Sequence, residues 1–178
     1  MPVSFPRADG QIPIHYNFKS TGKTFDNVGN PLQPGEYNEA NRYLDIPGSP
    51  LFPFGFGLSY SDFTYDDLHL SAEVISPEEQ ITVMMSVTNP GVRPGVAVAQ
   101  CYVQDCTASL TRPARELKGF RRVFLRPGES QQVEFTLGRR ELSFYGRDGK
   151  LRLEPGQFKV FVGADCRAAL EASFRLVE

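Results

Sequence analysis

Residues 81–89 read "ITVMMSVTN", and this stretch decides the fold of the chain. Its side chains alternate, and the set expected to point inward is Ile81, Val83, Met85 and Val87. A repeat of two residues is the period of a β-strand, in which successive side chains point to opposite faces. The letters "NPG" at its end signal a turn. The stretch therefore predicts a half-buried strand that stops at a tight turn.

Similar alternating segments occur on both sides of this stretch. With it, the predicted strands are residues 68–74, 81–89, 96–104, 119–125, 132–137, 158–163 and 170–177. Pro-Gly and Asp-Gly pairs separate several of them, because proline presets the first corner of a tight turn and glycine accepts a positive φ at the next. About seven short strands, and no helical window of useful length, predict an all-β fold. We expect a fibronectin type III-like or immunoglobulin-like β-sandwich.

The alternation also predicts which side chains fill the space between the two sheets. The first strand should turn one face inward, and that face carries Leu68, Leu70, Ala72 and Val74, while His69 points to solvent. Each of the other strands contributes its own inward set. The expected centre of the inter-sheet core is Leu70, Val83, Val87, Phe135, Val160 and Phe174.

Residues 1–60 have a different character from the rest of the chain. They show little periodicity, with a brief extended piece, "GQIPIHYNF", followed by a polar and glycine-rich run. A run of this composition cannot bury enough apolar surface to order itself. We therefore expect a mostly irregular segment at residues 1–60, ahead of a sandwich domain at residues 61–178.

The letters "SPLFPFGFGLSYSDF" at residues 49–63 place five aromatic rings around closely spaced prolines and glycines. Such spacing excludes a helix or a central strand and predicts a shaped loop. A loop in water has no reason of its own to carry so much apolar surface, so its rings fill a crevice beside another body or line a ligand site. The candidate residues are Phe52, Phe54, Phe56 and Tyr60.

Composition narrows the classes of partner. With 19 Lys and Arg against 21 Asp and Glu, the net charge is -2, and no basic run interleaves with aromatic residues, so nucleic acid is not an expected partner. Apolar runs are too short for a membrane span, and the first ten residues lack the features of a signal peptide. The absence of tryptophan weighs against an autonomous carbohydrate-binding module without excluding it.

The residues that could carry chemistry have structural explanations. Most carboxylates lie in turns or point outward from predicted strands, and we expect no catalytic residue, cofactor or metal site. The acidic run "DFTYDD" at residues 62–67 leaves calcium as a weakly supported alternative. The arginines of "TRPARELKGFRR" at residues 111–122 fit an anion site or the alternation of an edge strand. Cys101, Cys106 and Cys166 are expected to be structural thiols, with one Cys106–Cys166 bridge as the alternative.

Five motifs, taken in order, resemble a known family. They are "FPRADGQIPIHYN", "RYLDIPGSPLFPFGFGLSY", "VTNPG", "TRPARELKGFRRVFLRPGES" and "EPGQFKVFVG". Together they resemble the C-terminal end of the family 3 glycoside hydrolases of the bacterial β-glucosidase type, over nearly the whole chain. The first two are specific to that family, whereas the "RPGES" and "EPGQF" pieces occur in many β-sandwiches.

The resemblance implies a division of labour within a larger enzyme. The family places its aspartate nucleophile in an N-terminal barrel domain and its glutamate acid/base in the next α/β sandwich domain, so both would lie upstream of Pro2. Residues from Val3 to Tyr16 would then be the last strand of the α/β sandwich domain, followed by a linker and a fibronectin type III-like domain. The compartment stays unknown, since the family is often periplasmic or secreted and sometimes cytoplasmic.

For the aromatic loop, the resemblance implies a place in the seam between the catalytic domains and the sandwich. The outer mouth of the active site and an independent ligand site are the alternatives. The implied partners are the catalytic domains of the same enzyme, with an oligosaccharide or polysaccharide left open. An independent carbohydrate-binding or protein-binding module is the competing interpretation. The "FPRADGQIPIHYN" piece favours the enzyme, since an independent module has no use for the terminal strand of another domain.

Overall fold

A computed structural model of the chain describes residues 1–19 and 46–178. Strands dominate it. The elements in chain order are η1 (Asp9–Gln11), β1 (Thr64–Leu70), β2 (Val74–Ile75), β3 (Ile81–Thr88), β4 (Gly95–Asp105), β5 (Glu116–Leu125), β6 (Ser130–Leu137), α1 (Arg139–Leu142), β7 (Phe144–Tyr145), β8 (Leu151–Arg152), β9 (Gly156–Gly163) and β10 (Leu170–Leu176). Six of the seven longer strands match the predicted ones to within a few residues, the first is displaced along the chain, and the all-β prediction is confirmed.

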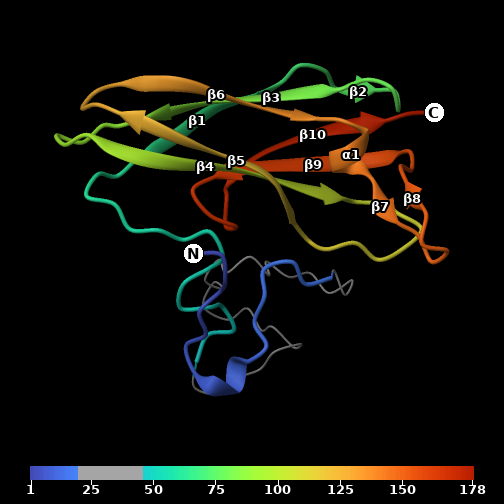
Figure 1. The fold of residues 1–178 in the computed structure, drawn as a ribbon, viewed down its shortest axis with the longest axis horizontal. Coiled ribbons are helices and arrows are strands. Elements are labelled where there is room, and N and C mark those ends of the chain that lie inside the picture. The colour runs from blue at the N-terminus through green and yellow to red at the C-terminus, as the bar shows by residue number, and fades with distance from the viewer. Residues whose placement is uncertain (20–45) are drawn as a thin grey trace, which may run out of the picture.

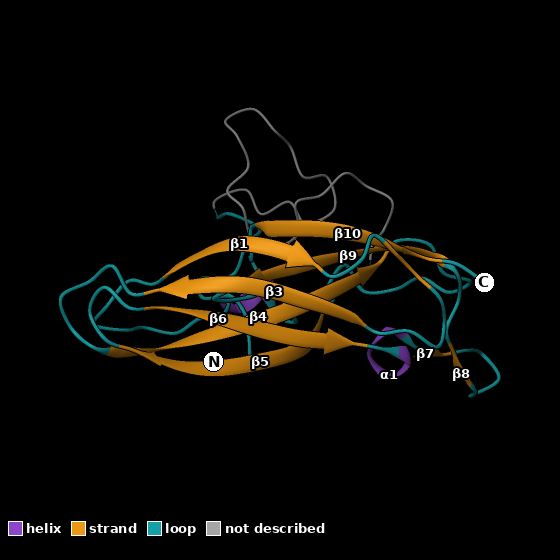
Figure 2. Cartoon of the chain, turned by 90° about the horizontal axis from the view of Figure 1, so that it is seen from above, coloured by secondary structure: helices purple, strands orange, loops and turns teal. Residues whose placement is uncertain are grey.

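Two sheets form the layers of the sandwich (Figures 1 and 2). One has the order β1-β3-β6 and the other the order β2-β10-β9-β4-β5, while β7 and β8 make a separate small hairpin. β2 pairs with β10 in parallel, and the other strand pairs are antiparallel. The five-stranded sheet lies between the three-stranded sheet and the described residues 1–19 and 46–60 (Figure 1). One face of this sheet is therefore turned toward the core and the other toward those two ranges.

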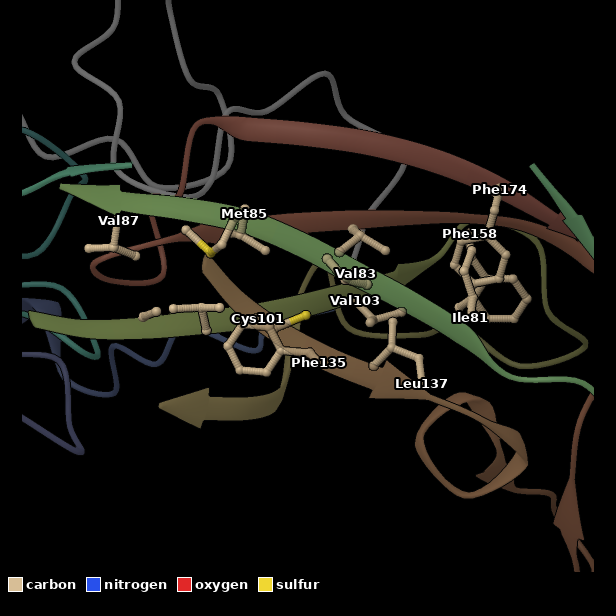
Figure 3. Close-up of a cluster of buried hydrophobic side chains, with 14 of the residues drawn as sticks. Ile81, Val83, Met85, Val87, Cys101, Val103, Phe135, Leu137, Phe158 and Phe174 are labelled. Atoms are coloured by element: carbon tan, nitrogen blue, oxygen red, sulfur yellow. The ribbon is translucent and has the colours of Figure 1, made fainter. Parts of the chain in front are cut away.

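The core between the sheets has the composition that the alternation predicts (Figure 3). The inward set of β3, from Ile81 to Val87, is fully buried. Phe158 of β9 and Phe174 of β10 stack with their ring centroids 5.3 Å apart. Of the six residues expected at the centre of the core, five are buried, and Leu70 packs against the cluster while partly exposed. The predicted core is confirmed.

The first predicted strand differs from the structure. β1 ends at Leu70, and its pairing with β3 shifts between Asp66 and His69, where Asp67 takes a left-handed conformation with φ of 54°. The chain then crosses to the other sheet as β2, so a single alternation does not extend from 68 to 74. Val74, expected to point inward, is 53% exposed, whereas its neighbour Ile75 is buried. The prediction was wrong at Val74 and right for His69, which is exposed.

The described parts of residues 1–60 form an irregular body held by a few specific contacts. We call residues 1–19 and 46–60 the N-terminal segment. Phe5 and Phe52 form an isolated antiparallel bridge, and the buried Gln11 donates from Nε2 to the carbonyl oxygen of Pro47 at 2.8 Å. These contacts join the two parts of the segment, and the polar run at 20–45 lies outside the described residues.

Residues 3–16, expected as the last strand of another domain, form no strand here and contain the 3-10 turn η1. A terminal strand needs a neighbouring strand to pair with, and the resemblance places that neighbour in a domain upstream of this chain. The strand therefore stays a prediction for the complete enzyme. Within the described ranges, no helix combines the length and apolar composition needed to cross a bilayer.

Candidate functional site

Two rings of the aromatic loop, residues 49–63, contact the sandwich: Phe63 packs against the main core, and Phe54 contacts the outer face. Phe54 stacks on Tyr16, with ring centroids 4.1 Å apart and an angle of 19° between the planes. Tyr16 in turn meets Tyr102 of β4 edge to face at 5.9 Å. Together these rings cover a small buried cluster made of Tyr102, Phe161, Cys166 and Ala168. Because the neighbours of Tyr102 and Phe161 along their strands lie in the main core, this cluster lies on the outer face of the five-stranded sheet.

Gln100 of β4 holds the backbone of the aromatic loop against the same face. Its side-chain amide nitrogen donates to the carbonyl oxygen of Gly55 at 3.1 Å and also to that of Ala164. Its amide oxygen accepts a hydrogen bond from the Tyr102 hydroxyl at 2.5 Å. Beside it, the Cys166 amide donates to the carbonyl oxygen of Phe54 at 3.0 Å. The buried amide thus has a partner for each end, as a buried polar group requires.

Two features of this arrangement depend on the local chemistry. Gly55 has φ of 84°, and a Cβ atom at this position would lie 2.3 Å from the Gln100 side-chain oxygen. Only glycine combines that conformation with so close an approach. Burial raises the pKa of Tyr102, so its hydroxyl keeps its proton and remains a donor to Gln100 at neutral pH.

The other candidate rings lie in different surroundings. Phe52 and Phe56 stack on each other at 5.0 Å, and Phe5 meets Phe52 edge to face at 6.4 Å. These three rings are half-buried or exposed and pack within the N-terminal segment rather than against the main core. Tyr60 is 93% exposed. The four predicted candidates therefore lie in three different environments. Among these four residues, Phe54 alone contacts the outer-face cluster.

Sequence reasoning missed the residues that receive the aromatic loop. These are Tyr16 in the N-terminal segment and the pair Gln100 and Tyr102 on β4. The available signal was weak, since a polar residue and a tyrosine at successive outward positions of a strand are also typical of a solvated face. Tyr16 lies far from β4 in sequence, and its hydroxyl accepts from the Leu117 amide at 3.2 Å. Contacts over such separations leave no periodic pattern.

The arginines of residues 111–122 are engaged in structural contacts. Arg112 pairs with Glu116 at 2.6 Å and lies over the Phe144 ring. Arg115 lies 3.7 Å above the Phe161 ring and donates to the carbonyl oxygens of Cys166 and Ala168, both at 2.9 Å. β5, which follows, is an edge strand of its sheet. These contacts favour the edge-strand interpretation over an anion site.

The remaining candidate groups do not assemble into a chemical site in the part of the chain that the structure describes. No group of three or more His, Cys, Asp or Glu residues there is placed to hold a metal ion. Burial raises the pKa of Asp105, while a hydrogen bond from the Ser109 hydroxyl lowers that of Glu154. A shallow pocket of about 410 Å³ is lined by Lys19, Ser109, Leu110, Thr111, Arg112, Pro113 and Arg147.

The three cysteines are free thiols, so the alternative of a Cys106–Cys166 bridge is not realised. Burial raises the pKa of Cys101 to about 12 and that of Cys166 to about 11. Cys106 is exposed. A thiol with a raised pKa carries little of the reactive thiolate at neutral pH, which fits a packing role for the two buried cysteines.

Comparison with known proteins extends these observations. Residues 97–166 match the family model of a fibronectin type III-like domain. The chain is 42% identical to the periplasmic β-glucosidase of Salmonella typhimurium over 99% of its own length and 22% of that protein. It is 36% identical to a putative β-xylosidase of Formosa agariphila over 99% of its length and 21% of that protein.

A solved structure shows the same likeness in three dimensions. A β-glucosidase from Erythrobacter marinus superposes with a TM-score of 0.85 at 36% sequence identity, covering 99% of this chain and 21% of that one. The chain thus spans about a fifth of the length of the proteins it matches. Because the likeness includes the N-terminal segment and the aromatic loop as well as the sandwich, the chain belongs to the family 3 glycoside hydrolases, as the accessory C-terminal part that contains their fibronectin type III-like domain.

Proposed function

We propose that this chain braces the catalytic domains of an enzyme that hydrolyses terminal β-D-glucosidic bonds with retention of configuration, and that it supplies no catalytic residue itself. The observation that carries the proposal is the contact of Phe54 and Gly55 with Tyr16, Gln100 and Tyr102. Through it, the segment that the family resemblance joins to the catalytic domains is held on the outer face of the sandwich.

The exposed surface of the N-terminal segment supports a seam with another domain. Its large apolar residues with substantial exposure are Met1, Val3, Phe5, Ile12, Leu51, Leu58 and Tyr60. Apolar residues gathered on so small a body are typical of a surface that another protein surface covers. Phe52 and Phe56 stack on each other, Phe5 meets Phe52 edge to face, and the two stacked rings would form the inner layer of that seam.

We expect the isolated chain to show no glycosidase activity. Retaining hydrolysis needs two carboxyl groups about 5 to 5.5 Å apart across the sugar, and the family resemblance places both upstream of Pro2. Purified chain should be assayed against aryl β-glucoside and aryl β-xyloside substrates, with the Salmonella typhimurium enzyme as the positive control. Turnover that survives repurification, and disappears when a carboxylate of this chain is substituted, would overturn the proposal.

A chimera tests the bracing role directly. In it, this chain replaces the matching fifth of the Salmonella typhimurium β-glucosidase, to which it is 42% identical. The bracing role requires the chimera to fold and hydrolyse its substrate, while the same enzyme cut off before this part should be unstable or inactive. A cut-off enzyme that keeps full activity and stability would show that no brace is needed.

Within the chimera, Phe56→Ser should lower the melting temperature and leave KM unchanged. The reason is that Phe56 stacks on Phe52 inside the proposed seam, and burying a phenylalanine is worth roughly 1.5 to 3 kcal/mol. Tyr145→Ser is the matched control, because its ring is 70% exposed on β7, outside the N-terminal segment, and its loss should change neither quantity. Tyr60→Ser tests the edge of the seam: a fall in melting temperature would extend the seam to Tyr60, and a rise in KM alone would place Tyr60 at the outer mouth of the active site.

The opposite result for Phe56→Ser would assign the aromatic loop to the mouth of the active site instead of the seam. If the melting temperature holds while KM rises, the rings of the loop line the substrate mouth, and the seam interpretation fails. Melting temperature and kinetics measured on the same protein samples separate the two roles, because only folded enzyme contributes to KM.

A further inference from the structure

The outer face of β4 and β5 extends beyond the part that the aromatic loop covers. In the antiparallel register of these strands, Val96 lies opposite Phe124 and Gln100 lies opposite Phe120, with Val98 between them on β4. Phe120 and Phe124 are each 57% exposed. We call Val96, Val98, Phe120 and Phe124 the β4–β5 patch.

The β4–β5 patch and the covered cluster share one face. On β4, Ala97, Ala99 and Cys101 lie in the main core, so the residues between them point outward together with Gln100 and Tyr102. On β5, Val123 and Leu125 point into the core, and Phe124 and Phe120 point away from it. Among the described residues, the N-terminal segment thus covers the Gln100 and Tyr102 end of a continuous face and leaves the other end largely exposed.

The other sheet shows what a solvated face of this protein looks like. The outward positions of β6 are all polar and exposed, and they are Ser130, Gln132, Glu134 and Thr136. A sheet face that stays in water usually carries such residues. The β4–β5 patch breaks that pattern with two phenylalanines and two valines, and apolar groupings of this kind mark interaction surfaces.

We propose that the β4–β5 patch is a second docking surface for the catalytic portion of the same polypeptide, adjoining the seam at the aromatic loop. This inference rests on the proposed function. It is supported by continuity, since the N-terminal segment already occupies the adjacent part of the same face. In that part, the Gly55 amide donates to the carbonyl oxygen of Met1 at 2.8 Å. It is also supported by size, because four-fifths of the matched relatives lies outside the part that this chain covers.

The chemistry of the patch defines the surface that fits it. Arg122 lies opposite Val98, in the middle of the apolar residues. A matching surface is largely apolar, with aliphatic or aromatic side chains against Phe120 and Phe124 and a carboxylate near Arg122. An apolar centre with a few charge pairs is the usual composition of a domain interface.

Site-specific thiol labelling tests the proposal. Cys106→Ser removes the exposed native thiol, and the two buried cysteines, whose pKa values are raised, react slowly. Into this background one adds a cysteine at a single position. Phe120→Cys probes the patch, Leu58→Cys probes the aromatic loop and Tyr145→Cys, on an exposed ring of β7, is the control. The rate of maleimide labelling is measured by mass spectrometry in the isolated chain and in the chimera with the Salmonella typhimurium enzyme.

The expected result is that the position 120 thiol labels at least about tenfold more slowly in the chimera than in the isolated chain, a factor equivalent to about 1.4 kcal/mol of docking free energy. The position 145 thiol should label equally fast in both. Protection at 58 without protection at 120 overturns the patch and leaves the proposed function intact. Protection at neither position overturns both.

Other occupants give their own signatures. If the position 120 thiol is protected in the isolated chain, and the protection grows with protein concentration, the patch joins two copies of this chain and the proposal fails. If protection at position 120 requires an added β-glucan oligosaccharide, the patch binds sugar and the proposal also fails.

Discussion

Phe135→Ala should lower the free energy of unfolding of the isolated chain by about 3–5 kcal/mol. The Phe135 ring is fully buried between the sheets, on the residue that pairs with Val83 of the central strand β3. Across the core it packs so closely on Gly119 that a Cβ atom there would lie 3.0 Å from its Cδ1 atom. Removing the ring leaves a cavity that these rigid strands cannot close. Denaturant unfolding followed by circular dichroism measures the loss.

The matched control is Phe124→Ala, the same change on the neighbouring sheet but at a ring that is 57% exposed. It should cost less than about 1 kcal/mol, because little packing is lost at an exposed position of a strand. Similar losses for the two variants would show that Phe135 does not lie in the inter-sheet core.

Gly55→Ala should release the aromatic loop from the sandwich while the sandwich itself stays folded. The added Cβ atom would meet the Gln100 side-chain oxygen at 2.3 Å, and the φ of 84° is strained for any residue with a side chain. Gln100 cannot turn away freely, because its amide is committed to Gly55, Ala164 and Tyr102. Strain and broken hydrogen bonds together should weaken docking of the loop by about 2–4 kcal/mol.

Amide hydrogen exchange measures the weaker docking of the aromatic loop at single residues. The Cys166 amide donates to the carbonyl oxygen of Phe54, so its exchange should accelerate by at least about tenfold when the loop detaches. Gly57→Ala is the control, since a Cβ atom at Gly57 would meet nothing within 4 Å. Unchanged exchange at Cys166 in Gly55→Ala would mean that the loop does not depend on this close approach.

The strands that could be predicted are those whose alternation is uninterrupted. β3, β6 and β9 each have one face in the core, so burial and sequence period coincide, as for Val83, Phe135 and Val160. The prediction failed after Leu70, because the chain changes sheets there and a period of two residues says nothing about a change of partner. The left-handed residue Asp67 also breaks the pairing without any glycine to announce it.

The candidate site could be predicted only as a group of rings. The density of phenylalanines identified residues 49–63 as a loop that needs a partner, but the partner of Phe54 is built from Tyr16 and Tyr102, which are distant in sequence.

The division between residues 60 and 61 stays a prediction. A cut there would remove Phe54 and bare the ring of Tyr102, so the sandwich side of the seam includes part of the preceding segment.

The interruption at Asp67 makes the β1 edge of the three-stranded sheet a poor template for fibril growth. β1 is an outer strand of the three-stranded sheet, and unpaired backbone groups on such a strand are a template for a strand of another molecule. The shift between Asp66 and His69 leaves only two short runs that a straight incoming strand could follow. An invading strand would need the same kink at the same place, so growth of a continuous intermolecular ladder stops at this position.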